Sequence, residues 1–501
     1  MIDLNTFVGC VVLGVIGWIT YKVYIYPYHI SPLRNIPGPP SESLFYGNIK
    51  SFINEESGEP YVKWTQQYGN FVKYHGFFNR PFLLITDTKL VQEIISNQVY
   101  EFTKPQNFGE LKTIIGDGLF LSEGETHKRQ RKMMTPAFTH NNVKSMFPPI
   151  IRVAFTLKGL IDDKVNKGES KIILSTYFSK TALDIIGLVG FNHEFNTLTS
   201  PSKLAEAYEF LMNNKLSFLN FTIRKLSNYV PIRKIPIAMN KKFTNSCKVI
   251  SQESENLIEE KYIDDKNNKL DGNDLLSLLI KINKTLPNEE KLTREELKYQ
   301  IMTFLLAGHE TTSNALSWGF YFLAKHPREQ DLLREELVKA FPDNSTFDPT
   351  FDEINSLEYL NCITKEVLRL VPPLIGAARY TTEDRVLGGH FIPKNTQIDI
   401  PITALHRSPS IWGPTANEFD PKRWLNPSLI KNVTNYNYLP FLTGARSCIG
   451  MKVATSEFKI VLSMLIRNFV FQTGPLVMKK KPGFLSKPDP YLELIVSKVE
   501  I

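Results

Sequence analysis

The chain has 501 residues, of which 42% are hydrophobic and 22% are charged, and both values are ordinary for a globular protein. This composition excludes a mostly disordered chain, a collagen-like fibre and a membrane protein with many spans. Lys and Arg number 59 and Asp and Glu number 51, so the net charge is only +8. A solvated basic face explains this small excess better than an acidic partner or an anionic membrane surface. Without a dense Lys/Arg block or zinc-finger spacing, we expect no nucleic-acid binding.

The N-terminus contains an uncharged stretch from Leu4 to Tyr21, flanked by Asp3 and Lys22. As a helix this stretch would cover about 30 Å, roughly the thickness of a hydrocarbon core. A buried soluble helix and a cleaved signal peptide are the alternatives. The signal peptide fits poorly, because no positive segment precedes the stretch and no small-residue cleavage site follows it. The tyrosines and basic residues after it predict a single-pass anchor with the large C-terminal part in the cytoplasm.

A proline-rich break, Pro37-Gly38-Pro39-Pro40, follows the anchor. Proline fixes the backbone and cannot sustain a helix, so the break predicts a stiff hinge. The sequence has no internal repeat and no second clear linker. We therefore expect an anchor at 1–25, a hinge at 26–40 and one large domain at 41–501. Within that domain, the Asn/Lys-rich stretch 261–269 is expected to form a surface loop.

The strongest helical pattern begins at Thr293, which forms a capping box with Glu296, and it continues without proline as far as Pro327. A helix of this length measures about 50 Å and must cross the whole domain. A second helix is predicted from Ser356 to Leu370. The chain is thus predicted to be mainly α with a minor β region. Short strands are expected at Phe71–His75, Phe82–Thr86 and Gln397–Ile402.

The four cysteines are too few for a disulfide scaffold, and their spacing fits no zinc site. They indicate a chain that faces a reducing compartment, and the sequence assigns no role to Cys247 or Cys362. Cys448 differs, because it lies in the segment FLTGARSCIG (441–450), just before a helical pattern that runs from Met451 to Phe471. Free N–H groups and the helix dipole favour a thiolate at that position.

The neighbours of Cys448 suit a flat, anionic cofactor. Gly444 and Gly450 leave room beside the sulfur, Phe441 can shield it from water, and Arg446 supplies a cation. The complete pattern F-x-x-G-x-R-x-C-x-G resembles the haem-binding loop of the cytochrome P450 superfamily of haem-thiolate monooxygenases. The resemblance implies the P450 fold and a haem b (iron protoporphyrin IX) cofactor. It makes Cys448 the axial ligand of the iron. The thiolate of this cysteine favours O–O cleavage.

A second motif, AGHETT at residues 307–312, lies midway along the long predicted helix. The small pair Ala307 and Gly308 leaves room for a diatomic ligand, and Glu310 and Thr311 can relay protons. Taken alone, the Thr311 hydroxyl would be expected to bond back to its own helix. The segment resembles the oxygen-activation motif of the superfamily, which implies a role in proton delivery. A zinc-protease interpretation fails, because the second histidine of that motif is missing.

Glu366 and Arg369 lie three residues apart on the second predicted helix and therefore share a face. Such a pair is usually a simple surface ion pair. Here it resembles the E-x-x-R pair of the superfamily, and a later arginine, Arg423, completes the implied triad. The resemblance assigns the triad to holding the cysteine loop in place rather than to chemistry.

Haem carries two propionates, so cations should converge on it. The segment 124–138 resembles the superfamily helix in which a Trp and an Arg four residues apart reach a propionate. Arg131 matches that arginine, while His127 stands at the tryptophan position and can still donate a hydrogen bond. Arg379 matches a further propionate-binding arginine. The alternative for each residue is a solvated surface position.

The resemblance covers roughly residues 30–480 and implies insertion of one oxygen atom from O₂ into a small lipophilic substrate. No flavin or nicotinamide domain is visible, so we expect electrons from an NADPH-dependent flavoprotein reductase, with cytochrome b5 as a further donor, at the endoplasmic reticulum membrane. Two alternatives remain. One is a haem-thiolate isomerase or dehydratase that acts on a peroxide without O₂, against which the intact Thr311 argues. The other is a non-catalytic haem-binding protein.

Two surfaces follow from this interpretation. A basic docking face for the reductase is hypothesised at Lys128, Arg129, Lys132 and Lys452, with ordinary surface charges as the alternative. Membrane contact of the 205–240 region is a further hypothesis, with a core-packed helix pair as its alternative. Substrate contacts are expected from the loop before Gly124, the 205–240 region, the long helix near Phe304, and residues 374–378.

Overall fold

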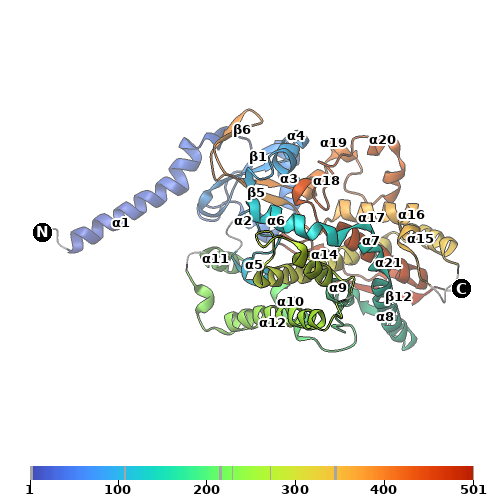
Figure 1. Ribbon diagram of the computed structural model, residues 1–501. Helices are drawn as coiled ribbons and strands as arrows, with labels where there is room; N and C mark the ends of the chain where they lie inside the picture. The colour runs from blue at the N-terminus through green and yellow to red at the C-terminus, as the bar shows by residue number, and fades with distance from the viewer. Residues whose placement is uncertain are drawn as a thin grey trace.

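The computed structural model (Figure 1) describes residues 4–105, 109–213, 217–227, 230–270, 272–342 and 347–499. Over these residues the protein is mainly helical with minor sheets, as the sequence predicts. The described residues behind the N-terminal helix contain one large apolar core, built chiefly from helices, and two smaller cores that include residues of the principal sheet.

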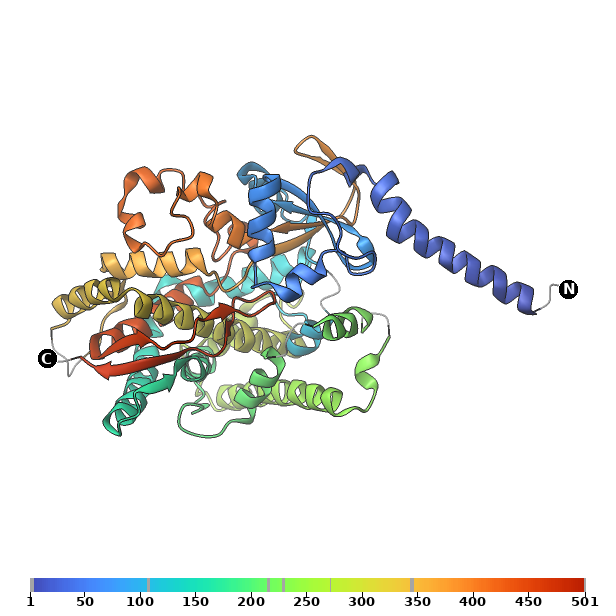
Figure 2. The ribbon, with the colours of Figure 1, turned by 180° about the vertical axis from the view of Figure 1, so that it is seen from behind.

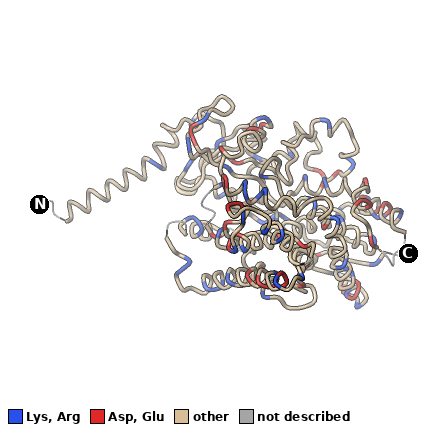
Figure 3. The backbone as a smooth tube through the Cα atoms, viewed as in Figure 1, with Lys and Arg blue, Asp and Glu red and all other residues tan. Residues whose placement is uncertain are grey.

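The N-terminal helix α1 (Leu4–Thr20) projects from the body and continues as a wider, π-type helix over Tyr21–Ile30 (Figure 2). Its charged residues are few (Figure 3). Among the described residues, 4–30 form the one helix that is long and apolar enough to cross a membrane. The base of this helix is fixed to the body, because the Asn79 side chain donates a hydrogen bond of 2.8 Å to the Val23 carbonyl. The helical conformation continues as far as Ile30, whereas the hinge predicted from the sequence begins at residue 26.

The principal sheet lies close to the base of the N-terminal helix (Figure 1) and has the order β1-β2-β8-β5-β3. Strands β2 and β8 pair in parallel, and the other neighbours are antiparallel. The three predicted strands are all present, with ends within two residues of the expected ones. The bounds are β1 Phe71–His75, β2 Pro81–Ile85, β3 Phe102–Thr103, β5 Ala377–Thr381 and β8 Gln397–Ile400.

Three smaller sheets complete the β structure of the described residues. Strands β4, β12 and β9 form a three-stranded sheet, and β6-β7 and β10-β11 are two-stranded. Their bounds are β4 Lys171–Ile173, β6 Arg385–Leu387, β7 His390–Ile392, β9 Phe469–Thr473, β10 Lys479–Lys480, β11 Pro488–Asp489 and β12 Glu493–Lys498.

The long predicted helix is α14 (Arg294–Lys325), and its ends confirm the expected signals. The Thr293 hydroxyl accepts a hydrogen bond from the Glu296 N–H at 3.1 Å, and the Glu296 carboxylate accepts one from the Thr293 N–H at 2.9 Å. Pro327 then begins the next helix. Helix α14 crosses the core, and α9 (Leu174–Phe191) packs along it.

The other α-helices surround this pair. Their bounds are α2 Ile49–Asn54, α3 Glu59–Tyr68, α4 Thr88–Gln92, α5 Glu110–Ile115, α6 Gly124–Met134, α7 His140–Ser145, α8 Phe147–Asn166, α10 Lys203–Met212, α11 Phe218–Leu226, α12 Ala238–Lys266, α13 Leu275–Thr285, α15 Pro327–Ala340, α16 Phe351–Ser356, α17 Glu358–Leu370, α18 Ile402–His406, α19 Pro409–Trp412, α20 Pro427–Ile430 and α21 Met451–Asn468.

Two sequence-based expectations about these helices are wrong. The stretch 261–269 is not wholly a loop, because α12 continues to Lys266; Lys261 is buried and its ammonium lies 2.8 Å from the Asp274 carboxylate. Helix α21 ends at Asn468 and not at 471, because Phe469 and the residues after it form strand β9 and pair with β12. In both places a contact with a distant residue accompanies the observed local structure: Asp274 for Lys261, and strand β12 for Phe469.

Candidate functional site

Cys448 lies between a short 3₁₀ turn (Gly444–Arg446) and the start of α21. Its N–H donates a hydrogen bond of 2.8 Å to the Phe441 carbonyl, which closes the loop. The Cys448 side chain is accessible, although it lies deep within the fold. Burial raises the pKa of this thiol, whereas the Gly450 N–H and the charge of Arg131 act in the opposite direction.

Gly444 lies where the cysteine loop packs closely on another part of the chain. Its φ of +73° favours glycine, and a Cβ there would lie 2.9 Å from the Ile95 carbonyl oxygen. Gly444 thus allows the loop to pack on the chain at 95–96. By contrast, a Cβ at Gly450 would meet no atom within 4 Å, so this side of the sulfur is open. The loop also holds Leu442 at a φ of +55°, an unusual conformation for a non-glycine residue.

Two predicted cations attach to the cysteine loop or its surroundings. The Arg131 guanidinium donates to the Ser447 carbonyl at 2.5 Å, which joins α6 to the residue before Cys448. Arg446 donates to the Ser122 carbonyl at 2.6 Å and forms an ion pair with Glu123. Both contacts keep positive charge beside the loop.

The third predicted cation, Arg379, is buried and under-satisfied. One of its terminal nitrogens donates to the Ala378 carbonyl at 2.8 Å, but Nε and Nη2 are buried without a partner among the described residues. Burial, followed by the charge of Arg446, lowers its pKa to about 10. A buried guanidinium with free donors needs hydrogen-bond acceptors, and an anion would also balance its charge. The propionates of a haem would fit both needs.

Lys104 is a further cation of this cluster that sequence reasoning missed. Its ammonium donates to the Phe120 carbonyl, and its pKa is held well below the usual range by burial and by the charges of Arg446 and Arg379. Glu123 is the one carboxylate that influences these pKa values within the described residues. The cluster therefore carries more positive than negative charge, and it fits the two negative charges of a haem.

His127 is buried, and its Nδ1 lies 3.1 Å from the Tyr100 hydroxyl. Burial, followed by the charges of Arg446, Lys104 and two further arginines, lowers its pKa to about 3. The imidazole is therefore neutral at physiological pH. When Nδ1 accepts from Tyr100, Nε2 carries the proton and can donate one hydrogen bond.

The AGHETT motif lies on α14 as expected, but its members face different ways. Between Gln300 and Tyr321 the helix is accessible at Leu306, Ala307, Gly308 and Thr311, and the other residues are buried. These four residues define an open face of the helix. The Thr311 hydroxyl donates to the Ala307 carbonyl at 2.7 Å, so its lone pairs remain available on that face.

Glu310 does not share this open face. It is buried, and the Lys487 ammonium lies 3.3 Å from its carboxylate. The hydroxyl of Tyr208 is also buried, without a partner among the described residues, and burial, followed by the negative charge of Glu310, raises its pKa well above the usual value. Phe304, expected near the substrate, is buried with its ring centroid 5.9 Å from that of Phe138.

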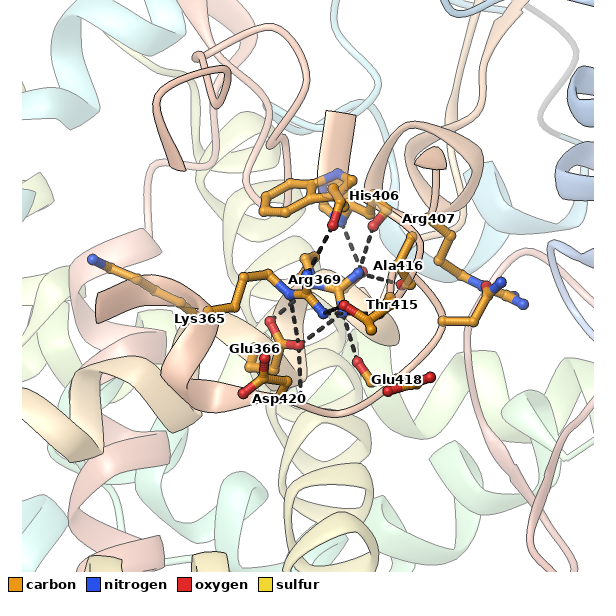
Figure 4. Close-up of polar contacts among 12 residues, drawn as sticks. Lys365, Glu366, Arg369, His406, Arg407, Thr415, Ala416, Glu418 and Asp420 are labelled. Atoms are coloured by element: carbon orange, nitrogen blue, oxygen red, sulfur yellow. Dashed lines mark hydrogen bonds and ion pairs between the residues drawn. The ribbon is translucent and has the colours of Figure 1, made fainter. Parts of the chain in front are cut away.

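The predicted triad of Glu366, Arg369 and Arg423 is assembled and almost fully buried, and Figure 4 shows the contacts of Glu366 and Arg369. Arg369 donates two hydrogen bonds to Glu366, at 2.7 and 2.9 Å, and Arg423 lies 3.4 Å from the same carboxylate. The remaining N–H groups of Arg369 donate to the carbonyls of His406, Ala416 and Glu418. All of its donors are used, which is what a buried guanidinium needs.

Sequence reasoning missed three groups of this site: Lys104, Tyr100 and Lys487. None lies in a recognisable motif, and each reaches the site only through the tertiary fold. Among the described residues, no group of three or more His, Cys, Asp or Glu side chains is placed to bind a metal.

Comparison with known proteins identifies the class. The model of the family described as Cytochrome P450 matches residues 37–494, and the chain belongs to this family. It is 33% identical to cytochrome P450 monooxygenase 205 of Postia placenta, over 96% of this chain and 94% of that protein. Monooxygenase 128 of the same fungus is 32% identical, over 94% and 93%. Cytochrome P450 monooxygenase sphH of Aspergillus fumigatus is 31% identical, over 95% and 91%.

The protein is thus a cytochrome P450 monooxygenase, an oxidoreductase that incorporates oxygen from O₂ into a substrate. The family carries a haem held by a cysteine thiolate. The predictions of the fold class, the enzyme class and the cofactor are confirmed.

Proposed function

We propose that Cys448 binds the haem iron and that this chain oxygenates a small lipophilic substrate. The observation that carries the proposal is the position of Cys448, an accessible thiol in a deep loop beside an excess of buried positive charge. An arginine with unpartnered donors, Arg379, belongs to that charge. A thiolate and a cationic cradle are the two features that a haem requires.

The propionates would be held by cations from four parts of the chain. Arg131 comes from α6, Arg379 from β5 and Arg446 from the cysteine loop, and Lys104 follows β3. Neutral His127 would donate a single hydrogen bond from Nε2, in place of the tryptophan expected at its position. Phe441 is half-buried beside the loop and would limit access of water to the sulfur.

When bound, the haem supplies the oxygen chemistry that places one atom of O₂ in the substrate and releases the other as water. The chain's own contribution is proton supply and water exclusion. The Thr311 Oγ1 atom, on the open face with Ala307 and Gly308, would accept and pass a proton there. Glu310 would supply protons from the buried side of α14, where the Lys487 ammonium lies 3.3 Å from its carboxylate.

A spectroscopic comparison tests the ligand. The reduced carbonyl complex of the wild-type protein should show the red-shifted Soret band that marks thiolate ligation, and Cys448→Ser should abolish it. Cys362→Ser is the matched control, because Cys362 is buried in a helix away from the motif. A red-shifted band that persists in Cys448→Ser would contradict the proposal.

We further propose an NADPH-dependent flavoprotein reductase as electron donor, with cytochrome b5 as a second donor. The expected docking face is only partly free, since three of its four cations pair with acids of this chain. The pairs are Lys128–Glu125, Arg129–Glu296 and Lys132–Glu290. Lys452 is exposed and has no ion pair among the described residues. Lys452→Glu should therefore raise the reductase concentration needed for half-maximal turnover, and the effect should vanish at high salt.

We propose the endoplasmic reticulum membrane as the location, with the catalytic domain in the cytoplasm. Helix α11 (Phe218–Leu226) has no buried residue, and it packs through Phe218 on Tyr46 near the base of the N-terminal helix. Residues 214–216 and 228–229 of the 205–240 region lie outside the described part of the chain. Helix α11 leaves its apolar side chains partly or fully accessible, which supports substrate entry from the membrane. Removal of residues 1–30 should release the chain from sedimenting membranes.

A further inference from the structure

His406 is a fully buried histidine at the C-terminal end of α18 (Ile402–His406). It makes a two-way contact with Arg369 (Figure 4): its Nδ1 lies 3.1 Å from the Arg369 carbonyl, and its own carbonyl accepts from the Arg369 guanidinium at 2.8 Å. On the other side of the ring, Nε2 accepts a hydrogen bond of 2.7 Å from the N–H of Leu439. The imidazole therefore bridges the buried triad and a separate segment of the chain.

These partners fix the protonation of the ring. The Arg369 carbonyl can only accept, so Nδ1 carries the proton, and the Leu439 N–H can only donate, so Nε2 is bare. A neutral imidazole with the proton on Nδ1 satisfies both contacts. Burial, followed by the charge of Arg369, lowers the pKa of His406 to about 3 and keeps this form at physiological pH. The ring also stacks on Tyr438 at a centroid distance of 5.2 Å.

Leu439 begins the segment of the chain that is hydrogen-bonded, turn by turn, to Cys448. It is fully buried, and its carbonyl accepts from the Leu442 N–H at 3.1 Å. The Phe441 carbonyl, in the same turn, accepts from the Cys448 N–H at 2.8 Å. The far end of the loop is held separately, by the bond from Arg131 to the Ser447 carbonyl. The bond from Leu439 to His406 is thus the attachment of the near end to the triad.

We propose that His406 is a positioning residue that couples the triad to the cysteine loop and holds the sulfur of Cys448 where it binds the haem iron. The proposed coupling runs through Nε2, which accepts the hydrogen bond from Leu439, while the face of the ring stacks on the neighbouring Tyr438. This inference rests on the proposed role of Cys448. His406 and Leu439 are 33 residues apart, so their contact cannot be predicted from the spacing of residues in the sequence.

Three substitutions of His406 distinguish the effect of its Nδ1 hydrogen bond from the effect of its Nε2 hydrogen bond. In His406→Gln the side-chain oxygen can replace the Nε2 acceptor and keep the bond from Leu439. In His406→Asn the amide nitrogen can replace the Nδ1 donor, but nothing reaches Leu439. In His406→Phe the stack on Tyr438 remains and both hydrogen bonds are lost. His75→Phe is the matched control, since His75 is also buried and its ring nitrogens have no partner among the described residues.

The readout is the reduced carbonyl spectrum of the full-length, haem-containing protein, together with haem content and the thermal midpoint. Leaving the buried Leu439 N–H without an acceptor should lower the ratio of thiolate-bound to thiolate-free haem about tenfold. We expect that loss in His406→Asn and His406→Phe, and a ratio close to the wild type in His406→Gln and His75→Phe. Haem content should stay the same, because the propionate contacts are intact.

Several outcomes overturn the inference. Undiminished thiolate ligation in both His406→Asn and His406→Phe would show that the bond to Leu439 does not position the sulfur. Equal losses in His406→Gln and His406→Asn would show a general packing role instead. If His406→Phe does not fold, the comparison of His406→Gln with His406→Asn still tests whether the bond to Leu439 positions the sulfur. A wild-type protein without the red-shifted band would overturn the proposed role of Cys448, and this inference with it.

Discussion

The Lys487 ammonium lies 3.3 Å from the buried carboxylate of Glu310, although the two residues belong to α14 and to a loop near the C-terminus. The loop is firmly placed, because the neighbouring Ser486 donates to the Pro372 carbonyl at 2.7 Å and accepts from the Trp318 side chain at 2.6 Å. A buried carboxylate costs free energy unless a partner stabilises its charge. Lys487 is that partner.

Replacing Lys487 with Met should therefore weaken proton supply. Without the ammonium the buried Glu310 carboxylate loses its ion-pair partner, and we expect product formation to fall about tenfold at unchanged haem content. NADPH consumption should fall less, so that more hydrogen peroxide is released per NADPH. Product, peroxide and NADPH are measured together with the reductase present.

Two further variants make this experiment specific. Lys487→Arg retains the charge and should restore most of the product yield. Lys479→Met removes an exposed lysine from the nearby strand β10 and should change nothing. A wild-type ratio of product to NADPH in Lys487→Met would contradict a role of this ion pair in proton delivery.

Arg379 leads to a prediction about cofactor retention. Its Nε and Nη2 donors are buried without partners among the described residues, and we predict that a haem propionate accepts hydrogen bonds from them. Arg379→Leu should speed the transfer of haem to an excess of apomyoglobin about tenfold, because a charge-assisted hydrogen bond is lost. The thermal midpoint of the haem-free chain should not fall, since the change removes an unsatisfied buried charge. The exposed Arg328→Leu is the control, and equal transfer rates in both variants would refute the assignment.

The sequence predicts the elements whose signals are local. The capping box at Thr293 and the proline at 327 define α14, and both bonds of the box are present. Local signals fail where a distant partner intervenes. Phe469 joins strand β12 rather than extending α21, and Lys261 continues α12 because Asp274 neutralises its buried charge.

The candidate site divides in the same way. The segment around Cys448 is contiguous, so its pattern can be read directly from the sequence. Lys104 and Lys487 are single residues in unremarkable loops, and only the folded chain brings them beside Arg446 and Glu310. The direction of a side chain is also absent from a motif: the sequence groups Glu310 with Thr311, whereas one is buried and the other lies on the open face.

The triad gives a prediction about stability. Glu366 accepts hydrogen bonds from Arg369, Arg423 and the Trp424 indole, and none of the charged groups reaches water. Glu366→Gln leaves two buried guanidinium groups without a carboxylate and should lower the free energy of unfolding by about 3–5 kcal/mol. Denaturant titration followed by circular dichroism measures the change. Glu125→Gln breaks an exposed pair with Lys128 and should show no detectable effect, so a similar loss in both variants would count against the buried network.

The last prediction concerns acid stability and His75, a buried histidine in β1. Burial, followed by the charge of Lys73, lowers its pKa to about 4, below the value of about 6.5 in an unfolded chain. The unfolded state therefore binds more protons between these pH values, and the free energy of unfolding falls as the pH falls. In that window His75 makes the free energy of unfolding fall by up to about 1.4 kcal/mol per pH unit. Above the window His75 adds nothing to the slope. His75→Phe should flatten the decline between pH 6 and pH 4.5 by about this slope, whereas the exposed His140→Phe should not. Denaturant titrations at four pH values measure the slopes, and parallel lines for His75→Phe and the wild type would disprove the assignment.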